Sequence, residues 1–205
     1  MLKSFAFMPR RVDSSRADFR TYYETRHTPL ALEYFRFQKY IRNHLADDQE
    51  PGFDCLSEFW HGDPTVAAKT MAGPAGEVLR VDERKFTDQS NIRAAVAESS
   101  LLSGPQRDYQ PGATPKTLWL LSGSDRPALL NAATAAAAGR TDRVMLDLLS
   151  PFDERPIPCD AILSVWGADD FAFTPPPGWS LRHRLPVLAE ETAPEILARS
   201  PQPAV

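Results

Sequence analysis

Cysteine is scarce in this sequence, and the usual metal and nucleotide motifs are missing. The chain has 205 residues and two cysteines, Cys55 and Cys159, too few for a disulfide framework. We expect both to be small buried hydrophobic residues. The histidines lack paired-ligand spacing, and neither GxGxxG nor GxxxxGK[ST] occurs. The sequence therefore predicts no metal and no dissociable cofactor.

Long apolar runs and a charge excess of one sign are also lacking. No segment approaches the roughly 20 apolar residues that cross a bilayer. The apolar run in the start, "MLKSFAFMPRR", is too short for a secretory signal, and no small-residue cleavage site follows it. The net charge is −4, with both signs interspersed, so no basic field is present to recruit nucleic acid. We expect a cytoplasmic protein without membrane or nucleic-acid partners, whose ligand is a small molecule.

The first hundred residues predict the element order βαββαβ. Strands are expected at 3–8, 37–45, 53–62 and 91–99, although the alanines of the last segment would also suit a helix. A helix capped by Ser15 should carry aromatic residues and His27 on one face and end near His27, because Pro29 disfavours helical geometry before it. A second helical region should run to about residue 86, with an interruption at Gly73.

The rest of the chain predicts a second unit of the same order. A linker rich in Ser, Gly and Pro occupies 101–116. The second unit, at 117–192, has its second helix reduced to a proline-rich loop, and a tail follows at 193–205. A local trace supports a repeat, since Asp54, Trp60 and Asp63 have the same spacing as Asp160, Trp166 and Asp169. The fold class is α+β, with ferredoxin-like units packed into an α+β barrel. The barrel could close within one chain or between two chains of a homodimer.

The stretch "SRADFRTYYETRHTPLALEY" resembles the signature of the EthD family in the dimeric α+β barrel superfamily, a capped helix of F-x-x-Y-[WY]-x-x-x-H-x-P-L type. "YIRNH" at 40–44 is similar to the family's Y-V-x-N-H strand, and "FDCLSEFW" to its D-G-x-x-E-x-W strand. "DERKFTD" at 82–88 fits the end of the second helix. The likeness covers residues 1–100. Cys55 stands where the family often has glycine, and the second half matches only in outline, so we expect the second unit to be degenerate.

The resemblance implies a function only broadly. Relatives include accessory proteins of degradation operons and cofactor-free isomerases, cyclases and dehydratases that act on lactones, phenols and polyketides. In the muconolactone methylisomerase branch, the residues matching His27 and Tyr40 line the substrate cleft. Heme-binding branches use a histidine of a later helix, and no histidine lies in 64–100 or in the alanine-rich helix, which counts against heme.

Candidate site residues follow from periodicity and from this resemblance. His27 is either a structural histidine or an acid–base group, and imidazole suits proton transfer near neutral pH. Tyr40, Arg42 and His44 alternate along one strand and face the same way. We take His27, Tyr40 and His44 as candidate catalytic residues. Candidate substrate-binding residues are Tyr23, Arg42, Trp60 and Phe7.

The remaining histidines and nucleophiles are assigned by position. Phe59 and Trp60 lie on opposite strand faces, so only one of them should reach the cleft. His61 follows at the strand end, where we expect it at the surface. His183 is expected to be an exposed strand residue or part of a distant second site. The sequence shows no serine or cysteine nucleophile with an adjacent base.

These residues suit proton transfer without a covalent intermediate. The leading hypothesis is a cofactor-independent lyase or isomerase, of dehydratase or cyclase type, acting on a hydroxylated aromatic, lactone or polyketide-like molecule. One alternative is a non-catalytic accessory protein that binds a hydrophobic metabolite. Another is a cofactor-free monooxygenase.

Overall fold

A computed structural model describes residues 2–62, 64–105, 109–167 and 170–199. The elements of the first half are β1 (Leu2–Met8), α1 (Arg16–Tyr22), the π-helical turn η1 (Tyr23–His27), α2 (Thr28–Tyr34), β2 (Phe37–Leu45), β3 (Cys55–His61), α3 (Pro64–Ala72), α4 (Pro74–Glu83), the 3-10 turn η2 (Gln89–Asn91) and β4 (Arg93–Ser103). Those of the second half are β5 (Thr114–Gly123), α5 (Arg126–Ala137), β6 (Val144–Pro151), β7 (Ala161–Trp166), β8 (Trp179–Glu191) and α6 (Pro194–Arg199).

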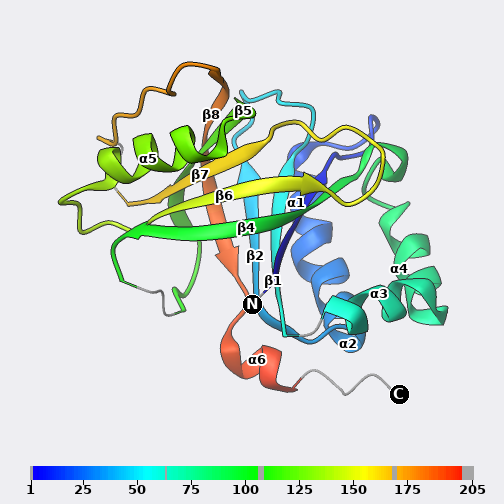
Figure 1. Cartoon of the computed structure of the whole chain (residues 1–205). Coiled ribbons are helices and arrows are strands. Elements are labelled where there is room, and N and C mark those ends of the chain that lie inside the picture. The colour runs from blue at the N-terminus through cyan, green and yellow to red at the C-terminus, as the bar shows by residue number, and fades with distance from the viewer. Residues whose placement is uncertain (1, 63, 106–108, 168–169, 200–205) are drawn as a thin grey trace.

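The strands form one closed antiparallel barrel within the single chain (Figure 1). Its order is β1-β3-β2-β8-β5-β7-β6-β4, which places β4-β1-β3-β2 of the first half beside β8-β5-β7-β6 of the second. Each half thus has the strand arrangement of a ferredoxin-like unit. The pairs β2–β8 and β4–β6 join the halves. The predicted fold class is confirmed, and the barrel closes without a second chain.

The two units repeat the same local contacts. The backbone of Asp54 bonds to Met8 and Leu45 at the ends of β1 and β2, and the backbone of Asp160 bonds to Leu121 and Leu149 at the ends of β5 and β6. The equivalence that the spacing indicated therefore holds for the two aspartates. Asp63 and Asp169 lie outside the described residues.

The tryptophans of the repeat also correspond. Trp60 pairs with Lys3 across β3 and β1, and Trp166 pairs with Lys116 across β7 and β5. Each ammonium lies over the ring of its partner, at 4.9 Å for Lys3 and 4.0 Å for Lys116. These buried cations contact Glu58, whose carboxylate accepts ion pairs from both lysines. The barrel interior is therefore partly ionic.

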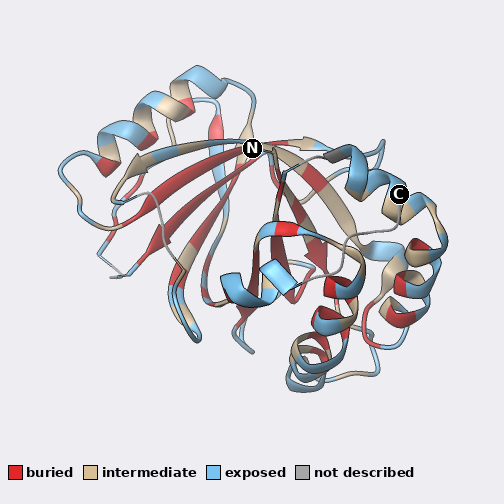
Figure 2. Cartoon of the chain, turned by 90° about the horizontal axis from the view of Figure 1, so that it is seen from below, coloured by how far each residue is buried: buried red, intermediate tan, exposed pale blue. Residues whose placement is uncertain are grey.

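Helices cover the two halves unequally. Helices α1 to α4 lie beside the first-half strands, and α5 lies over the second half near β4 and β6 (Figure 1). Between β7 and β8, the described residues 170–178 form no helix. In this loop Phe171 and Phe173 pack edge-on against Trp119 of β5, with ring centroids 6.1 and 6.0 Å from that of Trp119. Figure 2 shows that the strands are the most buried part of the molecule. The described part of the connection between β7 and β8 is a proline-rich loop, as the sequence predicted.

The first helical segment is longer than predicted. Ser15 caps it as expected, with its hydroxyl accepting from the backbone N–H of Asp18. The helix does not end near His27, however, and continues as α2 to Tyr34. The wide turn η1, in which the N–H of Thr28 bonds to the carbonyl of Tyr23, precedes Pro29. A π turn shifts the bonding register where proline can supply no N–H, so the chain remains helical.

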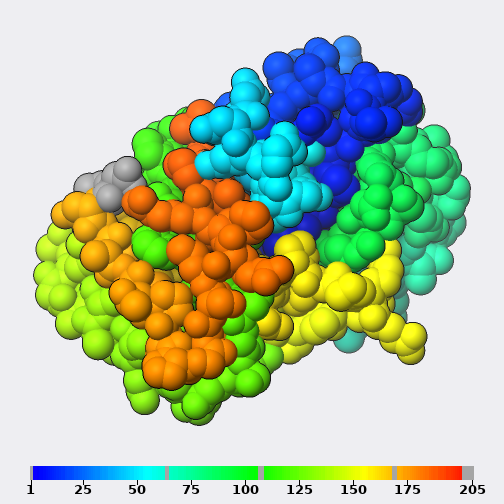
Figure 3. All heavy atoms as spheres, turned by 90° about the horizontal axis from the view of Figure 1, so that it is seen from above, coloured from blue at the N-terminus to red at the C-terminus, as the bar shows by residue number. Residues whose placement is uncertain are grey.

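Strand boundaries differ modestly from the predictions. β2 spans the predicted residues, whereas β4 extends through Ser103 and β5 begins at Thr114, so both strands enter the expected linker at 101–116. In the expected tail, residues 194–199 form the short helix α6. Figure 3 shows one face of the molecule, on which the blue and cyan segments of the first unit lie next to the yellow and orange segments of the second.

Candidate active site

A cavity of about 600 Å³ lies between the first-half sheet and its helices. Its walls come from β1, β2, β3 and β4 on one side and from η1, α2, α3 and α4 on the other. Most of the lining is aromatic or aliphatic, and the side chains with polar atoms are Ser4, Tyr23, His27, Tyr40, His61 and Glu83. A cavity of this size, mostly apolar with a few polar groups, is typical of a small-molecule site.

His27 reaches this cavity from the last residue of η1 and is paired with a carboxylate. Its Nδ1 lies 3.0 Å from Oδ2 of Asp82 on α4, and both side chains are buried. Burial alone would raise the pKa of Asp82, but hydrogen bonds from Tyr22, His27 and Lys85 hold it below its ordinary value. An ionised carboxylate only accepts, so Nδ1 must carry the hydrogen. Nε2 is then the ring nitrogen left to act on a ligand.

Tyr23 and Tyr40 form the polar part of the cavity wall beside His27. The hydroxyl of Tyr40 donates to that of Tyr23 at 3.1 Å, and the Tyr23 hydroxyl lies 2.7 Å from Oγ of Ser57. Burial is the main cause that raises the pKa of both phenols. Both tyrosines therefore stay protonated at neutral pH, and their hydroxyls are engaged with each other.

Arg42 and His44 share the strand face of Tyr40, as predicted, but they do not line the cavity. Both bind Glu24, with His44 Nε2 at 2.6 Å from Oε1 and an Arg42 guanidinium nitrogen at 2.7 Å from Oε2. Burial alone would raise the pKa of Glu24, but hydrogen bonds from His44 and Arg42 lower it to about 2. Burial lowers the pKa of His44, so its neutral ring donates to Glu24. This ionic cluster supports the helix from outside the cavity.

Of the two aromatic residues near the end of β3, Phe59 reaches the cavity and Trp60 does not. The Phe59 ring stacks on Tyr40 with centroids 4.9 Å apart. Trp60 faces the barrel interior beneath Lys3. Phe7 is likewise turned to the barrel interior, where its ring contacts Phe53 at 5.2 Å. The structure therefore brings together His27, Tyr40 and Tyr23, and leaves His44, Arg42, Trp60 and Phe7 outside the cavity lining.

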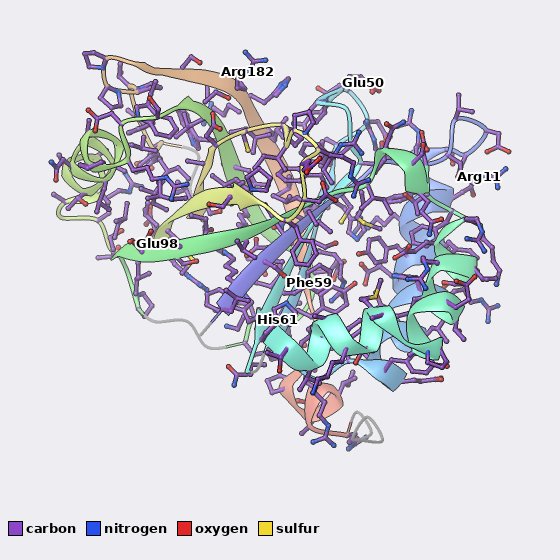
Figure 4. The ribbon with its side chains drawn as sticks, turned by 45° about the vertical axis from the view of Figure 1, so that its right-hand side comes forward. Arg11, Glu50, Phe59, His61, Glu98 and Arg182 are labelled. Atoms are coloured by element: carbon purple, nitrogen blue, oxygen red, sulfur yellow. The ribbon has the colours of Figure 1, made fainter. Side chains whose placement is uncertain are left out.

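The expectation for His61 is wrong. Its side chain is 8% exposed, lines the cavity, and has Nε2 2.8 Å from Oγ of Ser4 on β1. Figure 4 shows Phe59 and His61 side by side near α3. His61 is covered because its ring packs beside Phe37 and Phe59 and faces a cavity that α3 also lines. The structure also pairs a serine with a histidine, which the sequence did not indicate. His183 is half-buried and lies in a separate groove with Arg182.

Reasoning from the sequence missed Asp82, Glu24 and Ser4. Asp82 lies in the stretch "DERKFTD" that fits the family pattern, and this was the only available signal. Glu24 lies three residues before His27, but its partners on β2 come from a distant part of the chain. Ser4 and His61 are 57 positions apart, so their pairing has no local signature.

Cysteines and possible metal ligands can be placed as well. Cys55 and Cys159 are buried, as predicted, and burial raises the pKa of both thiols. Among the residues that the structure describes, no cluster of His, Cys, Asp or Glu is arranged to hold a metal ion. In the same part of the chain, no helix has both the length and the apolarity to cross a membrane.

Solved structures resemble the chain over nearly its whole length at low identity. A protein described as anthrone oxidase-like aligns with 93% of this chain and 92% of its own, with 11% identity and a TM-score of 0.54. A candidate monooxygenase from Fusobacterium nucleatum subsp. nucleatum aligns with 92% of this chain and 91% of its own, with 9% identity and a TM-score of 0.50. These likenesses show a shared fold. No curated protein sequence matches the chain significantly.

The family comparison is more specific than the structural one. The family model described as the EthD domain matches residues 12–90. This range contains His27, Asp82, all four helical elements that line the cavity and two of the strands beneath it. Residues 12–90 of the chain are therefore similar to an EthD domain, which lies in the first half of the α+β barrel.

Proposed function

We propose that this protein is an enzyme that performs acid–base chemistry on a hydroxylated, largely apolar small molecule. The reaction class is that of a cofactor-independent lyase or isomerase, of dehydratase or cyclase type. One observation carries the proposal: a buried His27–Asp82 pair opens onto a mainly apolar cavity. A histidine held by a carboxylate is suited to take up a proton and to be stabilised as the cation.

The chemistry uses a single proton. Nε2 of His27 removes a proton from a phenol or from a carbon beside a carbonyl group, and Asp82 stabilises the imidazolium that forms. The same proton returns to another carbon, which completes an isomerisation, or to a leaving hydroxyl, which departs as water. Tyr23 and Tyr40 act as an uncharged wall, because burial raises the pKa of both hydroxyls. The apolar lining limits the access of bulk water to the intermediate.

The direct test is proton exchange followed by ligand-observed NMR in D₂O. The panel consists of hydroxylated naphthalenes, lactones and cyclic ketones. Wild type should convert a member of the panel or exchange its acidic C–H for deuterium. His27→Gln should bind the same compound while losing at least about a hundredfold in exchange rate, the usual range for a lost general base.

A matched control is available at His183, which lies in a separate groove. His183→Gln changes a histidine that lies away from the cavity, and its exchange rate should equal that of wild type. Equal rates in His27→Gln and wild type would overturn the assignment of the base. Binding of panel members by wild type, with neither exchange nor turnover, would favour the accessory protein that binds a hydrophobic metabolite.

A cofactor-free monooxygenase is the second candidate function. The anion that His27 would generate in an apolar cavity is electron-rich and can reduce O₂. A methylene group would become a carbonyl group, with one oxygen atom retained in the product and the other released as water. The descriptions of the two structural neighbours are compatible with this chemistry. Consumption of one O₂ per turnover would support this candidate, and turnover in anaerobic solution would exclude it.

A further inference from the structure

Ser4 and His61 form a polar pair in the cavity that the proposed proton transfer does not use. Oγ of Ser4 lies 2.8 Å from Nε2 of His61, and both side chains line the cavity. The two residues come from neighbouring strands, since β1 pairs with β3 so that Ser4 lies opposite Phe59. Their backbones are held in the barrel, so the pair is positioned rigidly.

The pair lies well away from His27. The ring of His27 is 5.2 Å from the ring of Tyr23, whose hydroxyl reaches Ser57 on β3. His61 is four residues further along the same strand, or about 13 Å at 3.3 Å per residue. His27 and His61 therefore lie at separate positions in the lining of one cavity.

Aromatic side chains form the wall between these positions. Tyr40 and Phe59 stack with centroids 4.9 Å apart, and Phe37 lies 5.2 Å from Tyr40. The His61 ring then lies 5.6 Å from the ring of Phe37. Flat aromatic surfaces favour a flat aromatic ligand, because offset stacking adds to the burial of apolar area.

The chemistry of the pair suits an uncharged oxygen substituent. Burial lowers the pKa of His61, which keeps its ring neutral at physiological pH. A neutral imidazole has one donor and one acceptor, and a serine hydroxyl has one donor and two acceptor lone pairs. After the bond between them is made, the pair can still donate one hydrogen bond and accept another. A hydroxyl or carbonyl group on a ligand would satisfy this capacity.

We propose that Ser4 and His61 form a second, specificity-determining position, which binds an oxygen substituent at the end of the substrate remote from His27. The substrate class is thereby narrowed to fused-ring aromatic compounds that carry oxygen at both ends. This inference rests on the proposed function, because it assigns the same cavity to the substrate. Ser4 and His61 are positioning residues and take no part in the proton transfer.

The experiment compares two fluorescent probes that differ by one hydroxyl, 2-naphthol and 2,6-dihydroxynaphthalene. Their dissociation constants are measured by titration on wild type, Ser4→Ala, His61→Phe and the double variant. Wild type should favour the diol by about tenfold, the value of one well-made hydrogen bond in a dry site. Each single variant should bring the ratio close to one while leaving the affinity for 2-naphthol unchanged. The double variant should lose no more than either single variant, because the two side chains act as a unit.

The outcomes separate this inference from the proposed function. If the diol preference persists in Ser4→Ala and His61→Phe, or is missing in wild type, the second position is wrong while the role of His27 is unaffected. If wild type binds neither probe, the assignment of the cavity to hydroxylated aromatics falls, and this inference falls with it. His27→Gln serves as the internal comparison, because it should leave the diol preference intact. Circular dichroism and thermal melting check that each variant is folded. If His61→Phe does not fold, Ser4→Ala still tests the pair, because it removes only the hydroxyl oxygen of a half-buried side chain.

Discussion

Asp82 of α4 holds the Nδ1 side of His27 at 3.0 Å, although the two residues are 55 positions apart. The contact joins the turn η1 to α4 and fixes which ring nitrogen faces the cavity. Tyr22 and Lys85 bind the other carboxylate oxygen of Asp82, at 2.7 and 3.2 Å. His27 and Asp82 are therefore part of one hydrogen-bonded junction between helices.

Asp82→Asn should impair catalysis more than binding. The amide can still accept from Nδ1, but it carries no charge to stabilise the imidazolium, and its NH₂ group can favour the wrong ring tautomer. We expect kcat to fall by roughly 10²-fold, the scale of a general-base contribution, with a small change in KM. Tyr22→Phe is the matched control, because it removes another partner of Asp82 while leaving the charge. A kcat for Asp82→Asn within a factor of two of wild type would show that the carboxylate has no such role.

Filling the cavity from α3 should weaken ligand binding while the barrel stays intact. Ala67 lines the cavity and is half-buried, so Ala67→Trp would place an indole ring in the space available to the ligand. Isothermal titration calorimetry with an aromatic compound that wild type binds should show at least about a tenfold lower affinity in Ala67→Trp. Lys69→Trp, on the exposed side of the same helix, should bind as wild type does. Equal affinities for the two variants would place the ligand elsewhere.

Glu24→Gln should destabilise the protein in a pH-dependent way. The folded-state pKa of Glu24 is about 2, against 4.5 for the unperturbed group, because His44 and Arg42 bind the carboxylate. A lowered carboxyl pKa stabilises the folded state above pH 4.5, and this stabilisation disappears as the pH falls towards 2. At pH 7 the variant should lose about 3 kcal/mol of the free energy of unfolding in urea.

The difference between wild type and Glu24→Gln should therefore shrink as the pH is lowered from 4.5. Glu33→Gln changes an exposed glutamate on α2 and should follow wild type at each pH. A deficit in Glu24→Gln that stays constant down to pH 2 would contradict the ionic explanation and indicate a packing effect instead.

Glu58→Gln should be the most destabilising of these single changes. Glu58 is fully buried and pairs with Lys3 at 2.9 Å and with Lys116. Burial alone would raise its pKa, but the charges of Lys116 and Lys3 hold it well below its ordinary value. Lys3 keeps its pair with Asp147 at 2.7 Å, but Lys116 loses its carboxylate partner. A buried ammonium group left without its partner should reduce the free energy of unfolding by about 3–5 kcal/mol. Glu98→Gln, at an exposed position on β4, should leave stability within about 0.5 kcal/mol of wild type.

The sequence predicted where the candidate site lies better than it predicted which residues line it. Residue spacing placed His27 on the inward face of its helix, and strand alternation placed Tyr40, Arg42 and His44 on one face of β2. The three side chains share a strand face but not a site, because Arg42 and His44 bind Glu24 and do not line the cavity. His61 was assigned to the surface from its place at a strand end, and alternation along a strand cannot show that α3 covers that end.

The sequence alone determined the order of strands and helices in both units and the inward orientation of His27. The signals for them were strand alternation, helical periodicity, the helix cap at Ser15 and the proline and glycine residues at element ends. These are local properties, set by backbone geometry within a few residues, so the sequence alone carries them. Only the tertiary structure decided that the barrel closes within one chain, that Asp82 orients His27, and that Ser4 meets His61. Such contacts join residues more than fifty positions apart, and they form only when packed strands and helices bring distant side chains to the same place.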